Sequence, residues 1–471
     1  MKLLLASALA LVAGCASAPS EAPAEQGDAL SETQTSLALR RCPAASGRTI
    51  AVAPSGGDAR TVQAGLDAAR PGDLVLVRAG VYHEAVRFPR SGTSAGCITL
   101  QGEAGAILDG AGASGNVGVT IEDRSWVAVV GLSVRGYRGG DTPTGIRVTG
   151  SPEVVEIRQN RVTGIESSRD AHGISFHGTG ATPMRDLLVD GNEVASCKLG
   201  SSESLVLNGN ITRFVVSHNT IHDNDNIGID FIGFEGVGPS GQDQVRGGIC
   251  VDNVVYNISS RGNPAYDGEL SADGIYVDGG KDIVIERNRV SSSDIGIEIA
   301  SEHRGKTTSD ITVRNNFVSG SQQGDIMVGG YAADRGFARN VAILQNTLYR
   351  AKGGEVIVQY NASDLTIANN VLVGQPGVPY VAATGTNDQN IRVDTNLYFG
   401  ASSSSAGTWA DAHALFADPK LAGGPSDLHL GPGSPARDAG STLGARAGAA
   451  DIDGQARLRG PAIDLGADEA D

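Results

Sequence analysis

Acidic side chains gather in segments of the chain that otherwise show the alternating pattern of buried strands. Residues 273–290, DGIYVDGGKDIVIERNRV, carry Asp273, Asp278, Asp282 and Glu286 between aliphatic positions. Grouped carboxylates can hold a metal cation or exchange protons with a substrate. They do so only if the fold brings them together, so the elements that position them decide the question.

A short phrase repeats through most of the chain. It consists of an aliphatic residue, two variable residues, Asn, one variable residue and a second aliphatic residue. Its nine asparagines are Asn160, Asn192, Asn219, Asn253, Asn288, Asn316, Asn346, Asn370 and Asn396. If each repeat is one coil stacked on the next at about 4.8 Å, each Asn can hydrogen-bond its counterparts above and below. The repeat therefore predicts a solenoid whose buried amides satisfy one another.

A second phrase, as in GIDFIG, GIYVDG and GIEIAS, alternates aliphatic residues with variable ones, which is the pattern of a strand with one buried face. Aligning its copies predicts columns of outward-facing side chains along the solenoid. The third position holds Asp230, Tyr276 and Glu298 in three successive coils, the fifth position holds Asp278, and Asp273 precedes the phrase. We expect these residues to form one cluster on an outer face, with Tyr276 exposed.

This pattern resembles the right-handed parallel β-helix family that includes the pectate lyases, and the resemblance covers about residues 70–400. It implies an all-β fold, a right-handed parallel β-helix solenoid with an N-terminal helical cap and a C-terminal cap segment. TVQAGLDAARPGDLVLVRAGVY looks like the helical cap, and the sequence from DLHLGPGSPARDAGS onward is similar to the terminal segment. We expect the N-terminal cap and first coils at 46–110, the repeats at 111–400 and the C-terminal cap at 401–471.

The N-terminus predicts export from the cytoplasm. Residues 1–15, MKLLLASALALVAGC, resemble a bacterial lipoprotein signal, which would make Cys15 the lipidated residue. An ordinary secretory signal with a chance Cys is the alternative. Residues 16–45 are rich in Ala, Pro, Ser and Glu and predict a flexible tether. Both interpretations place the protein outside the cytoplasm. As a lipoprotein it would lie in the cell envelope, periplasmic or at the surface, and would meet the membrane only through its lipid.

Composition excludes some partners. The formal net charge is −16, which argues against nucleic acid, because phosphate binding needs clustered Lys and Arg.

Cys42 and Cys97 flank the first structured segment and can pair in an oxidising compartment. Cys250 occupies an aliphatic position of the Asn phrase and is expected in the core. We expect a monomer.

The resemblance also implies a reaction. Polyuronate lyases in resembling families hold Ca²⁺ with acidic side chains against the substrate carboxylate, while Lys or Arg removes the proton at C5. Here the Ca²⁺ ligands would be Asp230, Asp273, Asp278 and Glu298. The substrate would be an acidic polysaccharide cleaved by metal-assisted β-elimination.

Further residues would complete this site. Lys306 is the preferred base and His303 the next, and Tyr276 and Glu298 belong to the same catalytic group. His172, His177 and Arg304 are expected to bind substrate. The sequence departs from the family pattern because no Lys or Arg lies in the strand columns around the acidic cluster, which leaves the base open.

Three other functions fit the same pattern. A glycoside hydrolase would use two of the carboxyl groups as acid and base, without a metal. A C5-epimerase is also compatible with this fold. A surface adhesin or glycan-binding solenoid would bind sugar and release no product, and carboxylates on a solvated face would then serve only to discourage aggregation.

Overall fold

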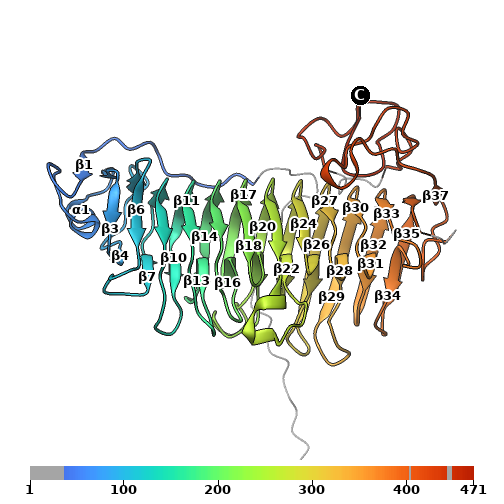
Figure 1. Cartoon of the computed structure of the whole chain (residues 1–471), viewed down its shortest axis with the longest axis horizontal. Helices are drawn as coiled ribbons and strands as arrows, with labels where there is room; N and C mark the ends of the chain where they lie inside the picture. The colour runs from blue at the N-terminus through green and yellow to red at the C-terminus, as the bar shows by residue number, and fades with distance from the viewer. Residues whose placement is uncertain (1–36, 402–404, 443–447, 471) are drawn as a thin grey trace, which may run out of the picture.

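The computed structural model describes residues 37–401, 405–442 and 448–470. It is an all-β parallel solenoid of about 13 turns, in which each coil adds one strand to each of three long sheets (Figure 1). The predicted fold class is therefore confirmed. Cys15 and residues 16–36 of the predicted tether lie outside the described residues.

The strands of the three sheets follow one another in chain order. Sheet A consists of β1 (Thr49–Val52), β2 (Leu74–Val77), β5 (Ile98–Gly102), β8 (Val127–Val130), β11 (Glu153–Arg158), β14 (Met184–Asp190), β17 (Ile211–Ser217), β20 (Val245–Val251), β23 (Lys281–Glu286), β26 (Thr307–Arg314), β29 (Phe337–Leu344), β32 (Ala362–Ala368) and β35 (Gln389–Asp394). Sheet B consists of β3 (Gly80–Tyr82), β6 (Ala106–Asp109), β9 (Ser133–Arg135), β12 (Arg161–Thr163), β15 (Glu193–Ala195), β18 (Thr220–Asn224), β21 (Val254–Ile258), β24 (Arg289–Ser293), β27 (Phe317–Ser319), β30 (Thr347–Tyr349), β33 (Val371–Val373), β36 (Leu397–Phe399) and β37 (Leu415–Phe416). Sheet C consists of β4 (Val86–Arg87), β7 (Val117–Glu122), β10 (Thr144–Gly150), β13 (His172–Gly178), β16 (Leu205–Gly209), β19 (Ile229–Ile232), β22 (Asp273–Asp278), β25 (Ile295–Ala300), β28 (Gly324–Val328), β31 (Gly354–Val358) and β34 (Val381–Ala383).

Helical structure is confined to short pieces in the described residues. The helix α1 (Val62–Ala68) lies at the N-terminal end of the solenoid, and its first turn is capped by the Thr61 side chain. Three 3₁₀ turns occur in loops: η1 (Ser260–Gly262), η2 (Pro264–Tyr266) and η3 (Gly424–Ser426). Among the described residues, no helix has the length and apolar character needed to cross a bilayer.

The core is a continuous aliphatic filling inside the three sheets. Ile275 and Val277 of β22 and Ile285 of β23 are fully buried in it, as the alternating pattern predicts. Cys250 is buried in the same core, which confirms its expected position. One strand can thus serve the core with one set of side chains and an outer face with the other.

The nine repeated asparagines form a continuous hydrogen-bonded column. In every step the Nδ2 group of one Asn donates to the Oδ1 atom of the next, at 2.9–3.1 Å. The backbone N–H of each Asn donates to the same Oδ1 atom. At the end of the column Asp411 accepts from Asn396 at 3.0 Å. Each amide is therefore satisfied by its own repeat.

The asparagines lie in a turn, whereas the sequence suggested a position inside a strand. Asn288 falls between the end of β23 and the start of β24, and the residue before it, Arg287, has a left-handed φ of 52°. The residue before each of the other eight asparagines also has a left-handed φ. This conformation costs free energy for a residue with a side chain, and the hydrogen bonds of the Asn column offset that cost while they fix the corner between sheets A and B.

The C-terminal segment differs in position from a simple end cap. β37 pairs with β36 at the end of the solenoid, where Asp411 terminates the Asn column. The chain then turns back and packs on the flank of sheet B, near β27, β30 and β33 (Figure 1). Residues such as Val371, Leu428 and Leu430 are buried at this contact. The segment therefore protects apolar side chains on the outside of sheet B.

The end of the predicted tether is fastened to the solenoid. Arg40 pairs with Asp186 at 2.7 Å, and the backbone N–H of Cys42 donates to Glu156 at 2.9 Å. Cys42 is joined to Cys97 by a disulfide bond. Residues 38–42 thus lie along sheet A. The sequence suggested the disulfide but not the contacts with Asp186 and Glu156, which lie more than a hundred residues away.

We predict that the Asn column is a large source of stability. Replacing Asn253 with Ala removes the acceptor for Asn219 and a donor to Asn288, both buried. Leaving such groups unpaired costs about 1–3 kcal/mol each, so we expect a loss of about 3 kcal/mol, measured by calorimetric unfolding. The control Asn116→Ala removes an amide at an exposed site that bonds the Gly139 carbonyl, and a change within about 0.5 kcal/mol is expected. Equal destabilisation by both variants would contradict this role.

Candidate active site

Strand pairing in sheet C brings the acidic residues together. Asp230 of β19 lies opposite Tyr276 of β22, which lies opposite Glu298 of β25. Asp273 and Asp278 are the two end residues of β22. The register predicted from the second phrase is therefore confirmed, and three successive coils supply the cluster.

The cluster is buried, although the sequence predicted an exposed face. Tyr276 is 4% exposed, and none of the four carboxyl residues exceeds 6%. They lie outside the aliphatic core, on the outer side of sheet C, and loops of neighbouring coils cover them. The covering loops are residues 233–244, 259–272, 301–306 and 329–336. The sequence shows the length of two of these loops but not that they fold back over the column.

Buried carboxylates also anchor the covering loops. Asp278 Oδ1 accepts a hydrogen bond from the backbone of Glu302 at 2.8 Å, which fixes loop 301–306. Asp294 accepts from the backbones of Ser260 and Ala272, at 2.8 and 3.2 Å, and so closes loop 259–272. The 3₁₀ turns of that loop lie at the lower edge of the solenoid beside β22 (Figure 1).

Asp273 and Glu298 form a carboxyl pair. Their buried carboxyl groups interact, the Asp273 Oδ1 atom has no hydrogen-bond partner among the described residues, and Gln359 Nε2 donates to Glu298 Oε1 at 2.5 Å. Burial raises the pKa of Glu298 to about 7. Burial and the adjacent Glu298 charge raise the pKa of Asp273 well above its usual range. Two adjacent buried carboxyl groups repel each other less when they share a proton, so the pair is suited to act as a buried acid.

Asp230 and Tyr276 lie beside this pair, and together with Asp278 these residues form what we call the floor of the site. Asp230 is 2% exposed, and its Oδ1 atom has no hydrogen-bond partner among the described residues. Burial, with the charges of Glu203 and Asp278, raises the pKa of Asp230 well above its usual range. Burial likewise raises the pKa of Tyr276, whose side chain hydrogen-bonds Glu302. Asp230 therefore has a free oxygen for a proton, a water molecule or a cation.

Glu235, Asp278 and His303 form a second group above this floor. One ligand atom from each lies within 4.8 Å of the others, a spacing that suits a metal ion. The His303 Nε2 atom is buried and has no hydrogen-bond partner among the described residues. Ca²⁺ prefers oxygen ligands, whereas an imidazole with carboxylates suits Mn²⁺ or Zn²⁺ better. The donor set thus fits a divalent cation, with His303 as the ligand that discriminates among metals.

The two predicted histidines of β13 lie two coils from Asp230. His172 Nδ1 is 3.3 Å from Glu203 Oε2, and the rings of His172 and His177 meet edge to face at 5.5 Å. Burial, with the nearby His172 and Arg147 charges, lowers the pKa of His177 to about 3. His177 is therefore neutral at physiological pH and suits hydrogen bonding better than proton transfer.

The predicted cations lie at the rim of the site. Lys306 Nζ is 5.1 Å from the centre of the Phe234 ring, and Lys306 and Arg304 are exposed on loop 301–306. Of the loop residues singled out from the sequence, only His303 joins one of the carboxylate groups. The structure thus separates a buried acidic floor from an exposed rim that carries both signs of charge, with Arg304 and Lys306 beside Glu302.

Several residues of the site escaped the sequence analysis. Glu235 and Tyr266 lie in two long loops, which follow β19 and β21, but the length of a loop does not say which of its side chains turn inward. Tyr331 and Arg335 lie in loop 329–336, whose coil is not unusually long. The sequence signal that could have identified them is the aromatic residue near a cation in GGYAADRGF, which are Tyr331 and Arg335.

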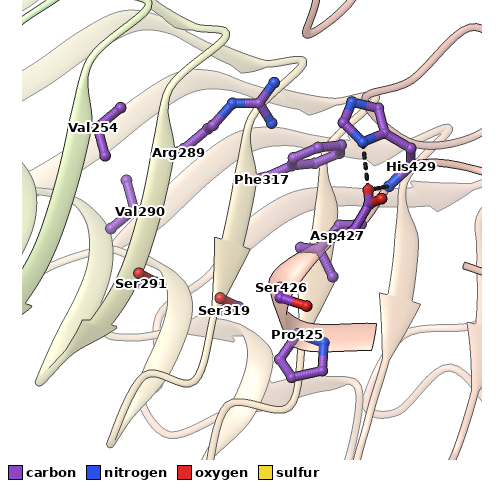
Figure 2. Close-up of a pocket in the computed structure, with 11 residues that line it drawn as sticks. Val254, Arg289, Val290, Ser291, Phe317, Ser319, Pro425, Ser426, Asp427 and His429 are labelled. Atoms are coloured by element: carbon purple, nitrogen blue, oxygen red, sulfur yellow. Dashed lines mark hydrogen bonds and ion pairs between the residues drawn. The ribbon is translucent and has the colours of Figure 1, made fainter. Parts of the chain in front are cut away.

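A separate cavity lies on another side of the solenoid. It has a volume of about 500 Å³ and opens between sheet B and the C-terminal segment (Figure 2). Arg289 and Phe317 line it from the sheet, and Asp427 and His429, joined by a hydrogen bond of 2.5 Å, line it from the segment. Because its residues come from sheet B, it is not part of the carboxylate site on sheet C.

Comparisons with known proteins establish the family of the chain. No family model matches it. The uncharacterized protein YwoF of Bacillus subtilis (strain 168) is 35% identical over 436 residues, which cover 83% of this chain and 92% of that protein. The chain belongs to the YwoF family. YwoF carries no assigned activity in its name, so membership alone assigns none.

Solved structures place the YwoF family among right-handed β-helix proteins. Pectate lyase Pel9A gives a TM-score of 0.53 at 13% identity, covering 91% of this chain and 98% of that one. The family 28 exopolygalacturonase of Yersinia enterocolitica gives 0.54 at 12% identity, covering 79% and 78%. PfbA, a surface adhesin of Streptococcus pneumoniae, gives 0.52 at 11%, covering 74% and 86%. These likenesses show the fold, which is shared by a lyase, a hydrolase and an adhesin.

We predict that the carboxyl pair makes stability fall with pH. In the unfolded chain both carboxyls ionise near pH 4, whereas in the folded protein the pKa of Glu298 is about 7. The folded state therefore binds more protons between these values, and its stability decreases as pH rises through this window. Thermal unfolding from about pH 4 to about pH 8 should show this decrease, and Glu298→Gln should reduce it. The exposed control Glu269→Gln should leave it unchanged, and identical slopes for both variants would contradict the pair.

Proposed function

We propose that this protein is a polysaccharide-active enzyme that hydrolyses a glycosidic bond of an acidic glycan. The observation that carries the proposal is the buried pair of Asp273 and Glu298, which holds a proton near neutral pH. Glycoside hydrolysis needs one protonated carboxyl group to protonate the leaving oxygen and one carboxylate to activate water or attack the sugar. Glu298, oriented by Gln359, supplies the acid.

Asp230 supplies the second carboxyl group. It stands two coils from Glu298 in the same column, and its Oδ1 atom lacks a partner among the described residues. Two strand spacings correspond to roughly 9.6 Å between backbones, and the strand between them carries Tyr276, so the attacking water would lie beside the Tyr276 ring. In this arrangement the ionised form of Asp230 removes a proton from the water as it attacks, Glu298 protonates the departing sugar oxygen, and the anomeric configuration inverts. Because burial raises the pKa of Asp230, this role requires a pH above that pKa.

The exported location remains a proposal, supported by the N-terminal sequence and by the Cys42–Cys97 disulfide, which persists in oxidising compartments. An acidic glycan as substrate is supported by the exposed Arg304 and Lys306 at the rim. Pel9A and the exopolygalacturonase act, by their names, on pectic polymers. The protein would thus meet its substrate outside the cytoplasm, tethered there if Cys15 is lipidated.

The hydrolase proposal is tested by product chemistry. The purified protein is incubated with polygalacturonate, alginate, glycosaminoglycans and neutral glycans, and reducing ends and unsaturated uronates are measured. New saturated reducing ends are expected, with a loss of about 100-fold or more in Glu298→Gln and Asp230→Asn. The control is Asp325→Asn, because Asp325 is equally buried on the neighbouring strand β28 and its pKa is also raised by burial to about 7. Full activity of Glu298→Gln on every cleaved glycan would exclude the proposed acid.

The second candidate is metal-assisted β-elimination, favoured by the group of Glu235, Asp278 and His303. A cation bound there would draw charge from a substrate carboxylate, so that the adjacent proton becomes acidic enough for a base to remove. Lys306 is then the available base from the sequence analysis, because His303 is a ligand of the cation. The residues of the floor would then bind and orient the sugar.

Metal dependence separates the two candidates. For elimination we expect unsaturated products that disappear with chelator and return with Ca²⁺, Mn²⁺ or Zn²⁺, and a loss of metal affinity in His303→Ala measured by calorimetry. The exposed control His218→Ala should bind metal as the unchanged protein does. Saturated products that persist in chelator would rule out elimination.

A further inference from the structure

Tyr331 is an exposed aromatic residue at the edge of the carboxylate site. It is 48% exposed, and the other large apolar side chains with high exposure belong to sheet B or the C-terminal segment. Its pKa is raised by partial burial and by the charges of Glu302 and Asp278, so its hydroxyl lies within the field of the site. No core contact accounts for this ring, and an exposed aromatic ring beside a reactive site is an available surface for a ligand.

The loop that carries Tyr331 is firmly held. Gly330 and Tyr360 exchange two backbone hydrogen bonds of 2.7 and 3.1 Å at its base. Gly336 N–H donates to Ser301 O at 2.9 Å, which ties the loop to the neighbouring loop 301–306. The Arg335 guanidinium carbon lies 4.7 Å from the centre of the Tyr331 ring. The aromatic ring and the cation are thus presented together on a fixed support, as a preformed binding surface requires.

The cations of the rim are available for an anion. Arg335 contacts the backbone oxygen of Glu302 at 3.5 Å, and Lys306 lies over Phe234. In the part of the chain that the structure describes, Arg304, Lys306 and Arg335 form no ion pair with a carboxylate within 4.0 Å. All three are exposed beside a floor that is rich in carboxyl groups. A guanidinium that is not paired with a protein carboxylate can bind the carboxylate or sulfate of a ligand through bidentate hydrogen bonds.

We propose that Tyr331 and Arg335 form a subsite for an anionic sugar residue of the substrate. The sugar ring packs against the Tyr331 ring, and its carboxylate or sulfate binds the Arg335 guanidinium. The inference rests on the proposed function, because the subsite would hold the chain while a neighbouring unit reaches Glu298. It adds the substrate class and the residues that select it.

The charge distribution explains why the anionic group belongs at the rim. The floor carries Asp230, Asp273, Asp278 and Glu298 close together, and a further anion there would be repelled. Arg335 is close enough to lower the pKa of Glu302 by its charge, so it lies where the rim meets the floor. A glycan with charged groups on some units can therefore place an anion on Arg335 and an uncharged linkage over the carboxyl pair.

Binding to an inactive background tests the subsite separately from catalysis. Glu298→Gln serves as the background, and calorimetry measures its binding of oligogalacturonates, oligomannuronates, chondroitin sulfate oligosaccharides and neutral xylo-oligosaccharides. Adding Tyr331→Ala or Arg335→Ala should weaken binding of the preferred anionic oligosaccharide about tenfold, the effect of losing one charge-assisted contact or one ring contact. Tyr331→Phe should retain binding, and Arg335→Ala should also reduce its salt dependence. Phe399→Ala, which removes an exposed ring on sheet B, is the matched control.

The outcomes distinguish the subsite from the reaction. Binding lost with Tyr331→Ala and Arg335→Ala supports the subsite even if the unmodified protein releases no product, in which case only the proposed function fails. The uronate and sulfate arms identify which anion is recognised. Unchanged affinity in both variants, equal affinity for neutral and anionic oligosaccharides, or no binding across the whole panel would overturn the inference.

Discussion

The hydrogen bond between successive asparagines is the constraint on which the rest of the structure depends. Each coil turns from sheet A to sheet B through a left-handed residue, and the side chain of the Asn that follows bonds the Asn of the next coil and a backbone carbonyl of the preceding one. A slip of one residue would leave buried amides unpaired along the column and would exchange inward and outward side chains. The column therefore fixes the register in sheet C, and that register places Asp230, Tyr276 and Glu298 in line.

Once the register is fixed, electrostatics shapes the site. The loops cover the carboxyl groups so completely that they cannot all be ionised in the absence of a counter-charge. Asp273 and Glu298 relieve part of this repulsion by sharing a proton, and Glu235, Asp278 and His303 offer a place for a cation. Protonation and metal binding are thus alternative responses to the same crowding, and they correspond to the two reactions considered. The proposed subsite at Tyr331 and Arg335 then favours an anionic ligand over a neutral one.

The solenoid and the acidic column were predictable because both depend on repetition. Each coil needs an Asn for the hydrogen-bonded column and aliphatic residues for the core, so the same residue types recur along the sequence and the pattern is visible there. The burial of Tyr276 was not predictable, because it depends on loops such as 301–306 whose sequences do not repeat. The same limitation applies to Glu235, to Arg335 and to the C-terminal segment on sheet B. Their contacts join residues far apart in sequence, and no local pattern encodes them.

The proton held by Asp273 and Glu298 can be observed by infrared spectroscopy during a pH titration. Protonated carboxyl groups have a C=O stretching band that ionised groups lack, and the difference between the unmodified protein and Glu298→Gln isolates the pair from other buried acids. The structure predicts a band that persists toward neutral pH, disappears around pH 7 and is lost in Glu298→Gln. A difference spectrum with no such band near neutral pH would mean that both carboxyls are ionised, and the pair could not then serve as the acid.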